Sequence, residues 1–135
     1  MKRIFLVFLL WLPLISHAEW KRVTYSDDGS VVAYFDPDRI KRNGTGDMSP
    51  VAWILVNYNK PQKDKTTGGK SYQSVLRKTM YDCKYEKTAY LQAVWYAQKF
   101  AHGDVIDSVE SNDYAWDSIV PNSMGEDELR FICKQ

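Results

Sequence analysis

The chain has few of the residues on which many enzymes and nucleic-acid-binding proteins depend. Its 135 residues include only two cysteines and two histidines, and its formal net charge is +1. A chain so close to neutral has no overall electric field that would attract a polyanion such as nucleic acid. We therefore expect no nucleic-acid partner, and any charged contact has to come from a local patch.

Catalytic signatures are also missing. The sequence contains no G-x-S-x-G motif and no C-x-x-C motif, and its one histidine outside the N-terminal segment is His102, beside Gly103. An exposed turn explains this histidine better than a role as a catalytic base. Asp36 and Asp38 flank a proline, as at a strand end, and offer too few oxygen atoms to hold calcium. We expect no enzymatic activity, no metal site and no cofactor.

The first 18 residues have the pattern of a secretory signal peptide. A basic start precedes twelve apolar residues, Ile4 to Ile15, and the small residues Ser16 and Ala18 follow. A helix that crosses a bilayer needs about 20 apolar residues, so this run is too short for an anchor. No cysteine lies near the expected cleavage site after Ala18, so the chain has no residue there to carry a lipid. We expect cleavage after Ala18, a mature domain of residues 19–135, no stable membrane anchor and a periplasmic or secreted location.

Export gives the two cysteines, Cys83 and Cys133, a simple interpretation. An even pair in a small domain most simply forms a disulfide in an oxidising compartment. The bridge would close a loop of about 50 residues, for which the chain-entropy treatment gives roughly 4 kcal/mol of stabilisation. A redox-active or metal-binding pair is the alternative, and the absence of a C-x-x-C motif argues against it.

The segment around Cys133 predicts a short C-terminal helix. Ser123 and Glu126 have the spacing of a capping box, and Leu129, Ile132 and Cys133 have the spacing of one apolar stripe. Acidic residues in the first turn and a lysine at the end suit the helix dipole. A helix this short is marginal in water by itself. We expect the disulfide to hold it on a sheet.

The rest of the chain predicts antiparallel strands. Residues 71–87 have the pattern of a strand, in which successive side chains point to opposite faces. One face would carry Val75, Arg77, Thr79, Tyr81 and Cys83. Other strand-like runs are 19–25, 31–37, 50–60 and 105–109, while 89–100 fits helix or strand and the Gly103–Asp104 turn favours a hairpin.

Residues 60–70 lack apolar side chains and predict a flexible connection between two of these strands. The expected fold class is α+β. It has an antiparallel sheet of about five or six strands with the C-terminal helix packed on one face and tied by the disulfide.

Two groups of basic residues are candidate binding surfaces. The first is a lysine-bearing loop with Lys60, Lys63, Lys65 and Lys70, and the second is a strand-edge cluster with Arg77, Lys78, Lys84 and Lys87. Basic residues interleaved with Tyr81, Tyr85 and Tyr90 could bind a polyanion or an acidic protein patch. Alternatively, the lysines keep loops soluble and protect sheet edges from pairing. The aromatic residues expected in the core or on a sheet face are Trp20, Trp53, Trp95 and Trp116.

The order of these segments resembles the surface-adhesin protein E family. The resemblance runs from Trp20 to Cys133 and rests on a series that includes "YFDPDRI", "YDCKYEK" and "W..IVPNSMGEDEL..IC". It implies an antiparallel sheet whose C-terminal helix is joined to it by the Cys83–Cys133 disulfide. It also implies a protein partner, either a host matrix or serum protein or an envelope component, and a capacity to form a homodimer.

The best-known member of the family is an outer-membrane lipoprotein, whereas this sequence lacks the cysteine that would carry the lipid. The family resemblance makes an adhesin-like binding protein the leading hypothesis. A soluble periplasmic partner or inhibitor protein with no adhesive role is the alternative, and an enzyme is the third class.

Overall fold

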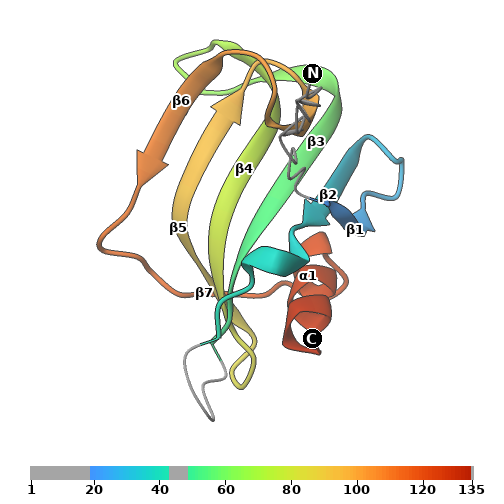
Figure 1. The fold of residues 1–135 in the computed structure, drawn as a ribbon, viewed down its shortest axis with the longest axis vertical. Helices are drawn as coiled ribbons and strands as arrows, with labels where there is room; N and C mark the ends of the chain where they lie inside the picture. The colour runs from blue at the N-terminus through green and yellow to red at the C-terminus, as the bar shows by residue number, and fades with distance from the viewer. Residues whose placement is uncertain (1–18, 43–48, 135) are drawn as a thin grey trace, which may run out of the picture.

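The protein is an antiparallel sheet with one C-terminal helix, as a computed structural model shows for residues 19–42 and 49–134 (Figure 1). The expected signal peptide at residues 1–18 lies outside these described ranges. The elements are β1 (Lys21–Tyr25), β2 (Val31–Phe35), the 3-10 turn η1 (Pro37–Arg39), β3 (Val51–Lys63), β4 (Ser71–Asp82), β5 (Lys87–Tyr96), the 3-10 turn η2 (Lys99–Ala101), β6 (Val105–Glu110), β7 (Asp117–Ser118) and α1 (Met124–Cys133).

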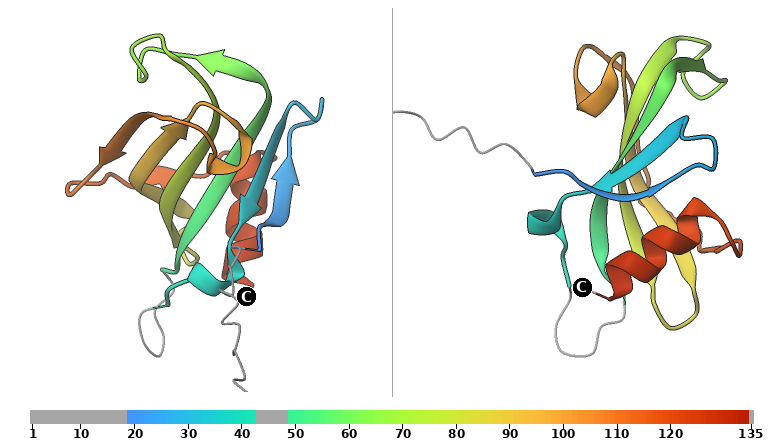
Figure 2. Two further views of the ribbon diagram at one scale, coloured as in Figure 1. Left: turned by 45° about the horizontal axis from the view of Figure 1, so that its top comes forward. Right: turned by 90° about the vertical axis from the view of Figure 1, so that its right-hand side faces the viewer.

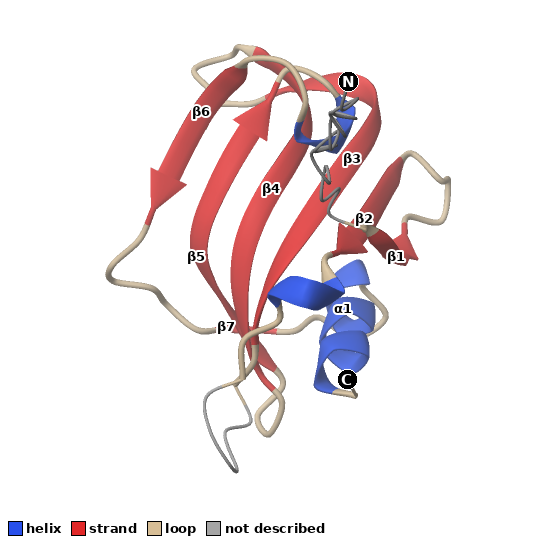
Figure 3. Cartoon of the chain, viewed as in Figure 1, coloured by secondary structure: helices blue, strands red, loops and turns tan. Residues whose placement is uncertain are grey.

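The sheet is a meander in which consecutive strands are neighbours. Its order is β1-β2-β3-β4-β5-β6, every pair is antiparallel, and the short β7 pairs with the start of β5. The seven strands include two-residue β7, which the sequence did not predict. The α+β class, the hairpin formed by β5 and β6, and the single C-terminal helix are confirmed (Figure 3).

Strand β3 shows how the sequence divides the two faces of the sheet. Ala52, Ile54 and Val56 point toward α1 and belong to the buried core, whereas the alternating positions, such as Trp53, point to the opposite face. The predicted connection at 60–70 is wrong in its first part, because β3 continues to Lys63 after an irregularity in its pairing with β4.

Helix α1 packs on one face of the sheet. Its Leu129 and Ile132 are buried in one cluster with Phe35, Ile54 and Tyr81, which confirms the predicted apolar stripe. The right-hand view of Figure 2 shows α1 on one side of the sheet and both 3-10 turns on the other. The helix therefore covers one face, and within residues 19–42 and 49–134 the two short turns are the elements on the opposite face.

The start of α1 is capped as its sequence predicts. The backbone N–H of Glu126 donates to the Ser123 hydroxyl at 3.3 Å. The Glu126 carboxylate accepts from the backbone N–H of Asn122 at 2.7 Å, one residue before the reciprocal bond of a standard capping box. The first bond satisfies one of the helix's unpaired N-terminal donors, and the second holds the residue just before the cap.

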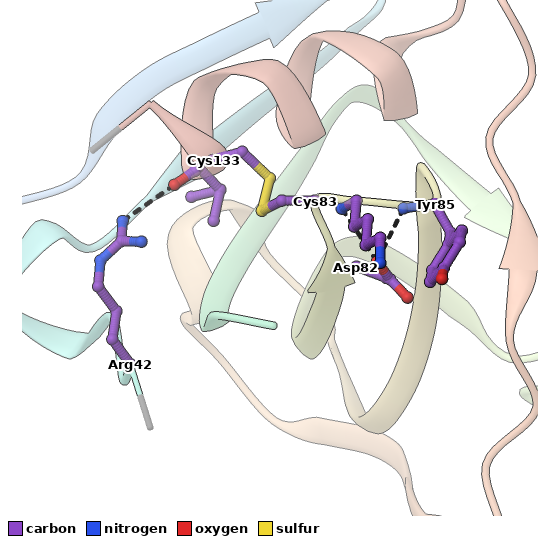
Figure 4. The surroundings of a disulfide bond; sticks show 7 residues. Arg42, Asp82, Cys83, Tyr85 and Cys133 are labelled. Carbon is purple, nitrogen blue, oxygen red and sulfur yellow. Dashed lines mark hydrogen bonds between the residues drawn. A yellow bond between two sulfur atoms is a disulfide. The ribbon is translucent and has the colours of Figure 1, made fainter. Parts of the chain in front are cut away.

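The end of α1 is fixed by the Cys83–Cys133 disulfide, which confirms the predicted pairing (Figure 4). Cys83 lies directly after β4, in a turn where the Asp82 carboxylate accepts from the backbone N–H of Tyr85 at 2.9 Å. Arg42 donates to the carbonyl oxygen of Ile132 at 3.0 Å. Both the sheet side and the helix side of the bridge are therefore held by further contacts.

We predict that Cys133→Ser lowers the free energy of unfolding by about 2 to 5 kcal/mol, the usual range for loss of a disulfide from a small secreted domain. Urea unfolding measures this change, and reduced wild-type protein is the matched control. Protection from hydrogen exchange should fall most in the last turn of α1. Protection over residues 124–134 equal to that of the oxidised protein would show that the helix does not need the bridge.

Candidate functional site

The four lysines of the predicted loop lie at one end of the sheet, around the connection between β3 and β4 (Figure 1). Lys60 and Lys63 belong to the end of β3, and Lys65 and Lys70 to the connection itself. All four side chains are exposed. No carboxylate among the described residues lies within ion-pair distance of any of them. We call these four residues the lysine end.

The connection at the lysine end is organised by internal hydrogen bonds. The Asp64 carboxylate accepts from the Tyr72 hydroxyl at 2.7 Å and from the backbone N–H of Thr67 at 3.1 Å. The buried Thr67 hydroxyl donates to the carbonyl oxygen of Lys70 at 2.8 Å. The hydrogen bond from Tyr72 lowers the pKa of Asp64 below its usual value. Asp64 is therefore engaged inside the turn and does not neutralise the lysines by direct pairing.

The second predicted cluster is not a single surface. Arg77 and Lys78 lie in β4, which is an interior strand of the sheet, so the expected strand-edge position is wrong for both. Successive strand residues point to opposite faces, and Arg77 points toward α1 while Lys78 points away from it. Lys84 and Lys87 lie at the turn between β4 and β5, at the other end of β4 from the lysine end (Figure 1).

Arg77 is committed to a contact inside the protein. It donates from Nη2 to both carboxylate oxygens of Glu128 on α1, at 2.5 and 2.6 Å, and the Tyr81 hydroxyl donates to the same carboxylate at 3.1 Å. The Arg77 side chain is 21% exposed and that of Glu128 is 4% exposed. Sequence reasoning placed Arg77 in a binding cluster, whereas the structure makes it a link between sheet and helix.

Electrostatics keep this link in its charged form. Burial by itself lowers the pKa of Arg77, but the carboxylate of Glu128 raises it, and the net pKa lies above the usual value. Burial raises the pKa of Tyr81, and the Glu128 carboxylate raises it further, so the hydroxyl keeps its proton and donates. Tyr81 is fully buried. It is therefore unable to be one of the contact tyrosines, whereas Tyr85 and Tyr90 are exposed.

The tryptophans are less buried than the sequence suggests. Trp20, Trp53 and Trp95 are half-buried and Trp116 is exposed, and none belongs to the core cluster among the described residues. Trp53 and Trp95 lie on sheet faces in β3 and β5, one of the two positions expected for them, the other being the core.

A groove of about 520 Å³ lies between β1 and α1. Four charged residues line it. Asp127 accepts from the Thr24 hydroxyl at 2.7 Å and Arg130 pairs with Glu126 at 2.6 Å, while Asp27 and Lys134 add one charge of each sign. The groove therefore shows no clear preference for an anion or a cation.

Residues 19–42 and 49–134 contain no group of three potential metal-ligating side chains. His102, the one candidate base, is exposed between η2 and β6. In the described part of the chain no helix combines the length and the apolar character that crossing a bilayer requires.

Comparison with known proteins points to one family. The sequence model described as "Surface-adhesin protein E" matches residues 20–134. No curated protein matches the chain by sequence.

Two structures of protein E from Haemophilus influenzae are similar in fold. Crystal form II gives a TM-score of 0.60 at 13% identity, covering 84% of this chain and 87% of that one. Protein E from a non-typeable strain gives a TM-score of 0.62 at 15% identity, covering 90% of this chain and 80% of that one. At such identities the likeness establishes the fold alone.

We predict that Glu128→Ala lowers the free energy of unfolding by about 3 kcal/mol, because it leaves the largely enclosed Arg77 side chain without its partner. The double variant Arg77→Met/Glu128→Leu should recover most of this loss, since it removes both charges. Urea unfolding of Arg77→Met, of Glu128→Leu and of the double variant measures the coupling between the two residues.

Arg130→Ala is the control for this prediction. It removes an exposed pair of the same helix and should cost about 0.5 kcal/mol or less. An equal loss for Glu128→Ala and Arg130→Ala would contradict the structural role of the buried pair.

Proposed function

The chain belongs to the surface-adhesin protein E family, and we propose that it is an exported envelope protein that binds a host matrix or serum protein through the lysine end. The family implies a binding protein and not an enzyme. The export of the protein, the identity of the bound protein and the residues that contact it are the parts that we propose.

The observation that carries this proposal is the form of the lysine end. Four exposed ammonium groups project from the end of β3 and from a turn that is closed by its own hydrogen bonds. Binding residues are often carried by loops that a rigid scaffold positions. A turn that is already ordered loses less conformational entropy on binding than a flexible loop does.

The chemistry of the lysine end selects an acidic partner surface. Unpaired surface lysines attract an acidic protein patch over roughly 10 Å at moderate ionic strength. Contacts of this kind raise the association rate and favour partners of opposite charge. We therefore expect the binding to weaken as salt concentration rises.

Lys84 and Lys87 form a separate and smaller basic site. The ammonium group of Lys84 lies 5.0 Å from the centre of the exposed Tyr85 ring. Because these residues lie at the opposite end of β4, they provide a comparison for the lysine end within the same chain.

We predict that changing the four lysines of the lysine end to glutamine weakens binding to immobilised basement-membrane extract and serum proteins by at least tenfold and flattens its salt dependence. Surface plasmon resonance at several salt concentrations measures both effects. The variant Lys84→Gln/Lys87→Gln is the matched control and should bind like the wild type. Loss of binding in that control alone would move the site to the other end of β4.

Localisation decides whether such a contact is available to the protein in the cell. We predict a mature N-terminus at Glu19, and release of the protein from the envelope by osmotic shock without detergent. N-terminal sequencing and cell fractionation provide the test. A strictly periplasmic protein absent from the surface and the medium would favour the soluble partner or inhibitor. Retention on membranes in high salt would contradict the expectation that the protein has no stable anchor.

A further inference from the structure

A shallow cavity of about 210 Å³ lies on the face of the sheet opposite α1. Its lining consists of Asp38, Arg39, Lys41, Val51, Trp53 and Lys78. These residues come from η1, from the chain that follows it, and from the adjacent strands β3 and β4. Figure 2 shows η1 on the side of the sheet away from α1. This cavity is separate from the lysine end, and no part of the proposed protein contact uses it.

Strand register brings the central pair of the cavity together. Trp53 and Lys78 are direct cross-strand partners, so their side chains leave the same face of the sheet. The ammonium group of Lys78 lies 6.0 Å from the centre of the Trp53 ring, within reach of a cation–π contact. On its other side Lys78 pairs with Gln92 of β5, which carries no charge. Lys78 thus has a ring and an amide beside it, and no acid in either adjacent strand position.

The segment around η1 brings two further cations to the same cavity. Lys41 forms two backbone hydrogen bonds with Val51, at 2.8 and 2.9 Å, which hold this segment against β3. Asp36 caps η1 by accepting from the backbone N–H of Asp38 at 3.0 Å and pairs with Arg39 at 3.1 Å. The position of η1 is therefore set by backbone and side-chain contacts together.

The charge of the cavity is positive. Three cationic side chains and one carboxylate, that of Asp38, line it. Within the described ranges no carboxylate lies within ion-pair distance of Lys41 or Lys78. Arg39 pairs with Asp36, which lies outside the lining. An anionic group placed here would find two ammonium groups without carboxylate partners.

The size and the indole ring narrow the class of ligand. The cavity volume of about 210 Å³ is below the roughly 300–1,000 Å³ of sites that bind drug-sized ligands. The cavity therefore has room for about one six-membered ring of a ligand. A pyranose presents a C–H face that packs on an aromatic ring, and an acidic sugar adds a carboxylate or a sulfate for the cations. We propose that this cavity binds one acidic sugar residue of a glycan, with Trp53 against the ring and Lys41 and Lys78 at the anionic group.

An acidic peptide is the competing ligand. An aspartate or glutamate side chain would use the ammonium groups but would leave the Trp53 ring with little to pack against. The chemistry of the lining therefore favours a sugar, and peptide binding becomes an outcome of the test.

The experiment is an NMR titration that follows the indole N–H signal of Trp53, assigned by its loss in Trp53→Phe. The probes are sialyllactose, a sulfated heparin disaccharide, neutral lactose, polyglutamate and inorganic sulfate. We expect at least one of the two acidic sugars to shift the signal with saturation, and neutral lactose to leave it unchanged. Which acidic sugar binds distinguishes a carboxylated from a sulfated ligand.

Two single variants test the cations. Lys78→Met and Lys41→Met each remove one ammonium group, and we expect each to weaken binding of the acidic sugar at least tenfold. Lys41 is exposed at the edge of the cavity, so its variant keeps the test valid if Lys78→Met does not fold. Lys63→Met, a single change in the lysine end, is the matched control and should keep full sugar affinity.

Several results would overturn the proposal. These are the absence of any saturable shift with both acidic sugars, an equal shift with sulfate or polyglutamate alone, and unchanged affinity in Lys41→Met together with a folded Lys78→Met. If the lysine end proves not to bind protein, the sugar-binding proposal is unaffected, because the two sites share no residue.

Discussion

The packing of α1 against β2, β3 and β4 is the contact on which the rest of this structure depends. A single sheet has two faces, and an apolar face without a second layer is not stable in water. Leu129 and Ile132 supply that layer for Phe35, Ile54 and Tyr81. A hydrogen bond from Thr24 to Asp127 fixes the start of the helix, the pair of Arg77 and Glu128 its middle, and the disulfide its end.

Because α1 covers one face of the sheet, the opposite face is less completely covered. There the cover consists of η1 and η2 alone among the described elements (Figure 2). Below η2, the buried side chains of Ser74 and Asn57 accept hydrogen bonds from the backbone N–H groups of Ala101 and Phe100 at 3.1 and 2.8 Å. The remaining part of this face keeps half-buried aromatic and charged side chains such as Trp53 and Lys78. The side chains proposed to bind a sugar thus lie on the face of the sheet opposite the helix.

Sequence reasoning succeeded where one physical rule dominates and failed where two compete. The disulfide follows from two cysteines, and the cap of α1 from Ser123 and its neighbours. Arg77 shows a conflict: alternation puts it on the face of Cys83, which points toward the helix, while its charge suggests the surface. The acid at Glu128 lies one position before Leu129 on the same helix, and this match of charges was the signal that could have paired them. Cavities such as that beside Trp53 depend on register, which residue types alone do not give.

The meander also has a consequence for how the chain acquires its structure. Each strand from β2 to β6 pairs with the strand before it, so most sheet contacts are local in sequence and favour rapid hairpin formation. The helix is the exception, because Asp127 has to reach Thr24, which lies 103 residues earlier. In a chain whose helix has not docked, the apolar face of β2 and β3 would be open to solvent. Partly folded chains of this kind are prone to aggregate, so docking of the helix also protects the protein from self-association.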